Sequence, residues 1–204
     1  MLRVFEESGF NSAKRMQDGF FEITFDLEHQ EEFSKRQAVR EHISRSTGMR
    51  RMLYPKTVAV IGASRQRGTI GGEILHNLIS HGFKGQVYPV NPAATIIQDV
   101  PSYPSIEEVP GPVDLAVIVV SAAAVVEVAA ACSRKGVKAL VVISAGFSET
   151  GAEGKARQAE LISVCRGAGM RLIGPNCMGI ANTNPEVLLD ATFAPGFPPR
   201  GRVG

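Results

Sequence analysis

Residues 56–92, KTVAVIGASRQRGTIGGEILHNLISHGFKGQVYPVNP, decide the predicted fold of this chain. The stretch begins with an apolar run, residues 58–61, of the length and composition expected of a buried parallel strand. A glycine-rich loop follows, and a second short strand at residues 86–90 ends at Asn91-Pro92. Between them, apolar residues recur on one face of a predicted helix: Ile70, Ile74, Leu75, Leu78 and Ile79. Strand, loop, helix and strand together indicate the opening βαβ unit of a nucleotide-binding sheet.

The glycine-rich loop has two interpretations. Glycines let backbone N–H groups approach a diphosphate at the helix N-terminus, where the helix dipole favours anions. Gly71 and Gly72 would also serve a purely structural role by letting the helix pack closely on the strand. We favour ligand binding for the loop as a whole, because its polar insert at residues 64–67, Ser-Arg-Gln-Arg, contributes nothing to packing.

The rest of the chain after residue 92 continues the alternation of strands and helices. Apolar runs predict strands at residues 114–120, 138–143 and 171–173. Two helices lie between them, and the residues expected to face the sheet are Val125, Val128, Ala129 and Cys132 in the first and Ala159, Ile162 and Cys165 in the second. This order predicts an α/β fold with a Rossmann-like, doubly wound parallel sheet. Ligands of such sheets bind beyond the carboxyl ends of the strands, here residues 62–72, 90–92, 120–123, 144–149 and 174–179.

The segments before and after these alternating strands and helices do not continue the pattern. Residues 13–16 and 20–27 flank Gln17-Asp18-Gly19, a strong hairpin signal, and residues 2–8 are expected to end a helix. Residues 29–52 are highly charged and are interpreted as a helical linker. Residues 182–204 are rich in Pro and Gly and are interpreted as a linker to a further domain. The main domain is therefore assigned to residues 53–181.

Composition excludes several classes of function. A net charge of +2 gives no argument for nucleic acid or an anionic membrane surface as a partner. No apolar run approaches the roughly 20 residues that span a bilayer, and the N-terminus lacks a secretory layout. Cys132, Cys165 and Cys177 include no Cys-x-x-Cys pair, so neither a disulfide framework nor a metal site is indicated. A reducing cytoplasm is the expected location.

The first candidate ligand for such a loop is NAD(P). Its fingerprint is Gly-x-Gly-x-x-Gly, followed about 20 residues later by a carboxylate for the ribose. Here Ala63-Ser64 stands where the second glycine should come, and Asn91 rather than a carboxylate ends the second strand. Both departures weaken the NAD(P) interpretation, which stays as an alternative in the form of a regulatory domain.

The departures fit another family. The runs VAVIGASRQRGTIGGEILHNL and GQVYPVNP resemble the coenzyme A-binding domain of NDP-forming acyl-CoA synthetases, which are relatives of the succinyl-CoA ligase α subunit. The later runs PVDLAVIVVSAAAV, ALVVISAGFSE, RLIGPNCMGIAN and ATFAPGFPPRGRV follow in the order typical of that family. The resemblance covers residues 52–204 and implies coenzyme A or an acyl-CoA as the ligand.

The resemblance also implies which residues contact the ligand. The pyrophosphate would be cradled by the loop residues Gly62, Ser64, Arg65, Arg67, Gly68, Thr69, Gly71 and Gly72. The adenosine would be flanked by Val90, Asn91 and Pro92. The pantetheine path would be lined by Ser121, Ala122, Ser144, Ala145 and Gly146, and the pocket near the thiol would be shaped by Asn176 and Cys177.

Two expectations follow for the loop. Members of the family often carry Lys or Arg just after the Asn-Pro, where this chain has Ala93 and Ala94, so Arg65 and Arg67 are the remaining candidates for pairing with phosphate. We also expect Gly71→Val to leave the fold largely intact and to abolish CoA binding.

The resemblance places the chemistry of the family outside this chain. Its ligase reaction passes phosphate through a histidine on the next domain and uses an ATP-grasp domain, whereas this chain has no His after His81. We interpret the chain as a fragment whose partners are neighbouring domains, with no catalytic residue of its own. Cys177 has no cationic neighbour in sequence and is interpreted as inert pocket lining.

Residues 1–28 resemble the last helix and closing strands of a GNAT-type acetyltransferase, in VFEESGF and DGFFEITFDL. That resemblance implies a parent that is either an acyl-CoA synthetase or a protein lysine acetyltransferase. A purely structural hub between catalytic domains is a third alternative, and the sequence leaves homo-oligomerisation and acyl-group specificity open.

Overall fold

The computed structural model describes residues 11–17, 20–26 and 48–201 and separates the chain into two units, residues 1–47 and 48–204. In the first unit, β1 (Asn11–Gln17) pairs antiparallel with β2 (Phe20–Asp26), from Gln17 opposite Phe20 to Asn11 opposite Asp26. The two strands of the predicted hairpin are therefore present. Its Asp18-Gly19 turn, the helix expected at residues 2–8 and most of the charged linker lie outside the described residues.

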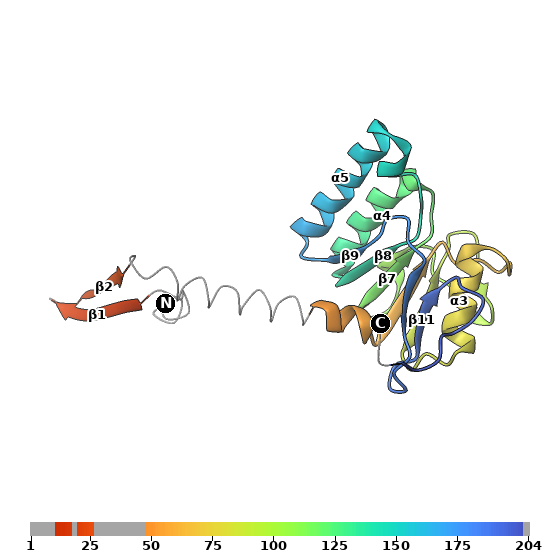
Figure 1. Ribbon diagram of the computed structural model, residues 1–204, viewed down its shortest axis with the longest axis horizontal. Helices are drawn as coiled ribbons and strands as arrows, with labels where there is room; N and C mark the ends of the chain where they lie inside the picture. Colours follow the sequence, from red (N-terminus) through yellow and green to blue (C-terminus); the bar gives the residue numbers. More distant parts are fainter. Residues whose placement is uncertain (1–10, 18–19, 27–47, 202–204) are drawn as a thin grey trace. The chain divides into compact units, whose positions relative to one another are not determined.

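The second unit contains a parallel sheet of five strands in the order β4-β3-β7-β8-β9, of which β7, β8 and β9 are labelled in Figure 1. The strands are β3 (Thr57–Ile61), β4 (Gln86–Val90), β7 (Leu115–Ile118), β8 (Ala139–Val142) and β9 (Arg171–Ile173). Helices α3 (Ile70–Ser80), α4 (Ala122–Lys135) and α5 (Ala152–Gly167) connect them. Because β4 and β7 lie on opposite sides of β3, the strand order switches there. The predicted Rossmann-like, doubly wound sheet is confirmed.

Shorter elements complete the second unit. Residues 48–53 are helical and lead into β3. A two-residue ladder joins β5 (Ile96–Ile97) to β6 (Val100–Pro101) after β4. Two 3-10 turns, η1 (Ile106–Glu108) and η2 (Ser148–Thr150), precede β7 and α5.

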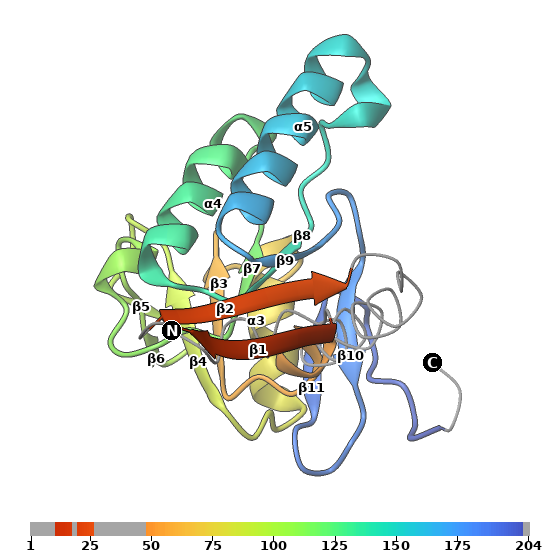
Figure 2. The ribbon, with the colours of Figure 1, turned by 90° about the vertical axis from the view of Figure 1, so that its left-hand side faces the viewer.

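The sheet separates two hydrophobic cores, because successive side chains of a strand point to opposite faces. Val58 and Val60 of β3 pack with Ile74, Leu75 and Leu78 of α3. Ala59 and Ile61 face the other core, which holds Val125, Ala129 and Cys132 of α4 with Leu161 and Cys165 of α5. The helices α4 and α5 lie side by side on that face (Figure 2). A strand covered on both faces is apolar at every position, which is why β3 is a continuous apolar run.

The helix faces differ in part from those expected. Ile70 and Ile79 of α3 are 45% and 41% exposed, so only the middle of the predicted stripe is buried. In α5 the expected inward residue Ala159 is exposed, and Leu161 is fully buried instead. Leu161 and Cys165 are four residues apart and share one face, whereas Ala159 is rotated by about 200° from Leu161.

The segment after β9 is more structured than the expected linker at residues 182–204. β10 (Gly179–Asn182) pairs antiparallel with β11 (Leu189–Thr192), and β11 lies against α3 (Figure 1). Leu189 and Ala191 are fully buried in the core on that side. Residues 189–192 are therefore part of the domain, since Leu189 and Ala191 lie in the same core as Ile74, Leu75 and Leu78 of α3.

Polar contacts fix β11 to α3 along the helix. The Nδ2 of Asn77 donates to the carbonyl oxygens of Thr192 and Ala194, both at 2.9 Å. At the end of the helix, Nδ1 of His81 lies 2.8 Å from Oδ2 of Asp190, whose side chain is fully buried. The His81 ring also stacks on Phe197, with 5.2 Å between centroids.

Candidate functional site

The loop between β3 and α3 begins at Gly62, directly after the carboxyl end of β3. Gly62 has φ +92°, its N–H donates to the carbonyl of Val90, and a Cβ at this position would lie 2.5 Å from the carbonyl oxygen of Val119. Thr69 caps the helix, because its Oγ1 accepts a hydrogen bond from the N–H of Gly72. The same hydroxyl donates to the carbonyl of Gln66. The loop is thus held in place by the hydroxyl of Thr69 and by the backbone bond from Gly62 to Val90.

Close packing requires the glycines at the start of α3. A Cβ on Gly71 would lie 2.1 Å from the carbonyl oxygen of Gly62, and one on Gly72 would lie 2.1 Å from that of Gln66. Both distances are to backbone atoms, which cannot turn aside. The structural interpretation of the loop, close packing of the helix on the strand, therefore applies to these two glycines. The expectation that Gly71→Val leaves the fold largely intact does not fit this geometry, because the larger side chain would displace the loop or the helix.

Arg67 is engaged within the loop. Its Nε and Nη2 each lie 2.9 Å from an oxygen of Glu73, and Glu73 also accepts from the N–H of Gly68. The bond from Arg67, followed by that from Gly68, lowers the pKa of Glu73 from 4.5 to about 2. The positive charge of Arg67 is therefore paired with Glu73 through two hydrogen bonds. The spacing of six residues between them gave no sign of this pair in the sequence.

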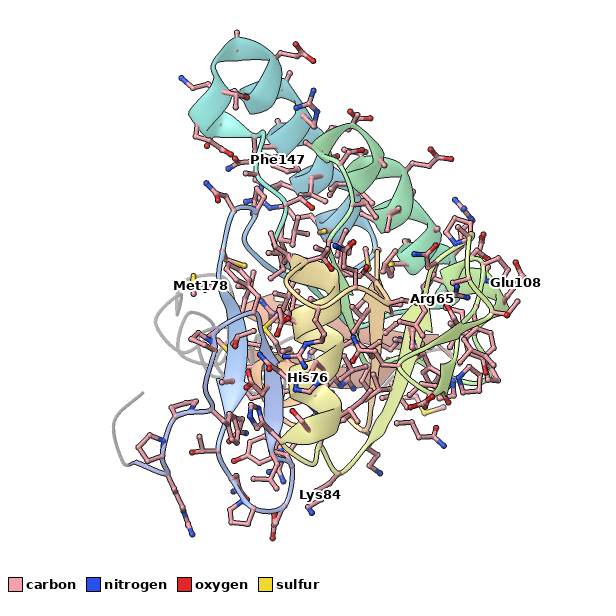
Figure 3. All side chains as sticks on the ribbon, turned by 90° about the vertical axis from the view of Figure 1, so that its right-hand side faces the viewer. Arg65, His76, Lys84, Glu108, Phe147 and Met178 are labelled. Atoms are coloured by element: carbon pink, nitrogen blue, oxygen red, sulfur yellow. The ribbon has the colours of Figure 1, made fainter. Side chains whose placement is uncertain are left out.

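Arg65 uses only part of its guanidinium group. Its Nε donates to the carbonyl of Ile96, and within the described residues it forms no salt bridge. Of the two predicted phosphate-pairing arginines, Arg65 is the one whose charge is not already paired. It lies on the opposite side of the N-terminal end of α3 from Met178 (Figure 3).

The end of β4 is tied to the loop by side-chain amides. Asn91 donates through Nδ2 to the carbonyl of Ala63 and accepts through Oδ1 from the N–H of Ala93, both at 2.8 Å. The side chain of Val90 lies in the core, so only its backbone reaches this edge, whereas Pro92 is exposed. Gln98 also holds the loop, since its Nε2 donates to the carbonyls of Ser64 and Gly72. No sequence pattern marked Gln98.

The ends of β7 and β8 supply the next predicted residues. Ser121 is the N-cap residue of α4 and is exposed, and Ala122 begins that helix. The Oγ of Ser144 donates to the carbonyl of Val120, which ties the two strand ends together. Gly146 has φ +106°, and its N–H donates to Glu149. Backbone N–H groups, that of Gly146 first, lower the pKa of Glu149.

A cavity of about 350 Å³ lies beyond the carboxyl ends of β7, β8 and β9. Its lining residues are Ile70, Val119, Val120, Ile143, Ser144, Ala145, Asn176, Cys177, Met178 and Phe193. It brings together four of the predicted residues, Ser144, Ala145, Asn176 and Cys177. The predicted loop residues and Val90, Asn91, Pro92, Ser121, Ala122 and Gly146 are not among its lining residues. Ile70 and Met178 fall within the strand-edge ranges predicted from the sequence, although no contact was assigned to them. No site role was predicted for Val119, Ile143 and Phe193.

Cys177 is half-buried, and its Sγ donates to the carbonyl of Val142 at 3.3 Å. The cavity lining includes no Lys, Arg or His that would activate this thiol. Cys132 and Cys165 lie in the core, where burial raises the pKa of their thiols to about 12 and about 11. None of the three is in a setting that favours a nucleophilic thiolate.

Other features of the described residues do not point to a different kind of site. They contain no group of three or more His, Cys, Asp or Glu side chains that could hold a metal ion. Across the same ranges, no helix is long and apolar enough to cross a membrane. A larger groove of about 630 Å³ lies between α4 and α5 and is lined by residues of both helices, from Ala123 and Glu153 near their N-terminal ends to Val164.

A doubly wound sheet with a glycine-rich loop at its switch point defines a nucleotide-cofactor-binding domain. The model of the CoA binding domain family matches residues 56–183. An ADP-forming acetate–CoA ligase of Archaeoglobus fulgidus is 48% identical over 155 residues, which is 76% of this chain and 22% of that protein. The alpha subunit of the ADP-forming acetate–CoA ligase II of Pyrococcus furiosus is 48% identical over 139 residues, 68% of this chain and 30% of the subunit.

Among solved structures, the dinucleotide forming acetyl-coenzyme A synthetase 1 of Ca. Korarchaeum cryptofilum, in complex with phosphate and ADP, matches with a TM-score of 0.67. It is 41% identical, over 72% of this chain and 31% of that one. The chain therefore belongs to the CoA binding domain family and is homologous to the corresponding part of ADP-forming acyl-CoA synthetases. It spans about a fifth to a third of the length of these relatives.

Family membership makes coenzyme A, free or acylated, the cofactor of this domain. The NAD(P) alternative is not favoured. The residue that follows β4 is Asn91, and its side-chain amide donates a hydrogen bond to Ala63 in the loop. A carboxylate for the ribose of NAD(P) is absent from that position.

Proposed function

We propose that this chain holds coenzyme A or an acyl-CoA in an extended conformation along the carboxyl ends of the five strands. The observation that carries the proposal is the order of the predicted residues in space. The strand order β4-β3-β7-β8-β9 puts Asn91, the glycine loop, Ser121, Ser144 and Asn176 in one line along the sheet edge. Four intervals between neighbouring strands span about 19 Å, which suits an elongated ligand.

The diphosphate would lie at the N-terminus of α3. In the first turn, the N–H of Gly72 is bonded to Thr69 Oγ1 and that of Glu73 to the Thr69 carbonyl. The N–H groups of Ile70 and Gly71 are left to bind an anion with the help of the helix dipole. Arg65 would add a positive charge on the adenosine side. The pantetheine would then pass Ser121 and Ser144 toward the cavity beside Cys177.

Calorimetric titration of the 204-residue chain tests this proposal. CoA should bind, and dephospho-CoA and NAD should bind more weakly because they lack the 3′-phosphate or the pantetheine. A folded sample that binds no CoA would refute the proposal. Tighter binding of NAD than of CoA would favour the dinucleotide alternative.

We further propose that the parent activity is ADP-forming acyl-CoA ligation, to which this chain contributes the CoA site. The acetate–CoA and 4-hydroxybutyrate–CoA ligases among the relatives support this activity. A protein lysine acetyltransferase is the second candidate parent, and the β1–β2 hairpin, similar to GNAT closing strands, is the observation that favours it. Incubating the chain with acetyl-CoA and following thiol release separates binding from turnover. Release above the buffer rate would contradict a binding role alone.

A further inference from the structure

The cavity beside Cys177 has an apolar mouth built from three separate segments. Ile70 is the first residue of α3, Met178 follows β9, and Phe193 follows β11. Met178 and Ile70 are 57% and 45% exposed, which is high for large apolar side chains that line one cavity. Val119 and Ile143 continue the apolar wall into the sheet. The cavity thus offers a hydrophobic surface at a strand edge that is otherwise polar.

The polar groups of the cavity are few, and most are used within the fold. Ser144 donates its hydroxyl proton to Val120, and Cys177 donates to Val142. The side-chain amide of Asn176 is exposed and forms no hydrogen bond within the described part of the chain. Asn176 has φ +56°, and its backbone N–H is fixed by the carbonyl of Ser144. The amide is therefore a positioned hydrogen-bonding group without an internal partner.

Charge is absent from the lining. None of the ten lining residues is Asp, Glu, Lys, Arg or His. An apolar ligand group loses no hydrogen bonds to water in such a place, whereas a carboxylate would lose hydration without gaining a cationic partner. The cavity therefore discriminates by charge as well as by hydrophobicity.

The position of the cavity identifies the part of the ligand that would reach it. Ile70 belongs both to the cavity and to the helix N-terminus proposed for the diphosphate. The cavity lies at the β7, β8 and β9 side of that point, and Arg65 lies at the other side (Figure 3). A CoA with its adenosine toward β4 would extend its thioester end into this cavity.

We propose that the cavity takes the acyl group of an acyl-CoA and selects uncharged apolar acyl chains, such as butyryl, over acetyl and over dicarboxylic groups such as succinyl. Ile70, Met178 and Phe193 are the specificity-determining residues, and the amide of Asn176 donates to the thioester carbonyl. This assignment rests on the proposed CoA site.

Butyryl-CoA and succinyl-CoA form a matched pair, because both acyl chains have four carbons and they differ in a terminal methyl or carboxylate. Full burial of a methylene strengthens binding by about 4-fold. Butyryl-CoA should then bind up to about 15-fold more tightly than acetyl-CoA. Succinyl-CoA should bind at least about 10-fold more weakly than butyryl-CoA, because its carboxylate has no partner in the cavity.

Calorimetry on the full chain with CoA, acetyl-CoA, butyryl-CoA and succinyl-CoA measures these ratios. Met178→Ala should reduce the preference for butyryl-CoA over CoA, and Met178→Lys should shift the preference toward succinyl-CoA. Met49→Ala is the matched control, since Met49 is similarly exposed, at 55%, and is not a cavity residue. It should change neither ratio.

The outcomes separate this assignment from the CoA site itself. A folded chain that binds none of the four compounds refutes the CoA site and the acyl pocket together. A chain that binds CoA but gives equal affinities for butyryl-CoA and succinyl-CoA refutes the acyl pocket alone. A preference for butyryl-CoA that survives Met178→Lys unchanged places the acyl group elsewhere and also overturns the assignment.

Discussion

Gly71→Ala is the substitution for which the structure gives the sharpest expectation. The added Cβ would lie 2.1 Å from the carbonyl oxygen of Gly62 and 3.0 Å from its carbonyl carbon. Both atoms belong to the backbone of a loop that Thr69, Asn91 and Gln98 hold in place. Either the start of α3 or the loop must shift for the methyl group to fit.

The magnitude follows from two opposing effects. Overpacking a tightly fitted site costs about 1–3 kcal/mol, and the upper end applies because the contact is with backbone. Alanine is favoured over glycine in a helix by about 1 kcal/mol. We expect Gly71→Ala to lower the free energy of unfolding by about 1–2 kcal/mol net. In a domain of this size that corresponds to about 2–8 °C in Tm.

Gly167→Ala is the matched control. Gly167 ends α5, its φ is not positive, and a Cβ there would meet no atom within 4 Å. This change should stabilise the protein slightly through helix propensity alone. Urea and thermal unfolding, followed by circular dichroism without ligand, compare the two variants with the parent. If Gly71→Ala is as stable as Gly167→Ala, the packing account of the glycine loop is wrong.

Further predictions concern the charged groups. Arg65→Ala should weaken CoA binding by about 1–3 kcal/mol, and the loss should shrink at high salt; an equal loss at all salt concentrations would contradict a phosphate contact. Arg67→Ala leaves the negative charge of Glu73 without its cationic partner near the proposed diphosphate, so the double variant with Glu73→Gln should bind CoA better than Arg67→Ala alone. Because the pKa of Glu73 falls from 4.5 to about 2 on folding, its stabilising effect is present above pH 4.5 and is lost toward pH 2. The stability difference between parent and Glu73→Gln should therefore disappear over that window in pH-dependent unfolding. Asp190→Ala should destabilise the chain by about 2–3 kcal/mol, because His81 and Thr192 both lose the buried carboxylate that they contact; an unchanged urea midpoint would show that these contacts contribute nothing.

The sheet could be predicted from sequence because its strands are continuous apolar runs separated by helices. The bounds of β4 and β9 agree with the predicted ranges, and the other strands differ only at their ends. β10 and β11 were missed since they are four residues long and lie among Pro and Gly. β11 contributes only two buried apolar side chains to the core, Leu189 and Ala191, and this pattern is too short to recognise in the sequence.

The position of the candidate site in the fold could be predicted from the sequence, but the contacts among its side chains could not. The glycine loop and the strand ends follow from the topology of the fold. The pairing of Arg67 with Glu73 across six residues depends on the turn of the loop, and periodicity does not reveal it. Gln98 reaches the loop from a backbone with φ +48°, for which the sequence gives no signal. Ile70 fitted the core stripe of α3 and instead lines the cavity, because the stripe is buried only in the middle of the helix.

The hydrogen bonds that hold β11 against α3 also position Phe193, one of the residues that line the cavity. Asn77 of α3 is buried and binds the carbonyl oxygens of Thr192 and Ala194, which lie on either side of Phe193 in the chain. Phe193 lines the cavity beside Ile70, at the other end of the same helix. One helix therefore positions both the proposed diphosphate site and the proposed acyl pocket.

Asn77→Ala removes both hydrogen bonds and should release Phe193 without touching the glycine loop. We expect it to weaken butyryl-CoA binding by about 5-fold or more, equivalent to about one net hydrogen bond, and to leave CoA binding within about 2-fold of the parent. Calorimetry with the two ligands on one preparation gives the comparison directly. Equal losses for CoA and butyryl-CoA would mean that β11 supports the domain as a whole and has no particular role in holding the acyl pocket.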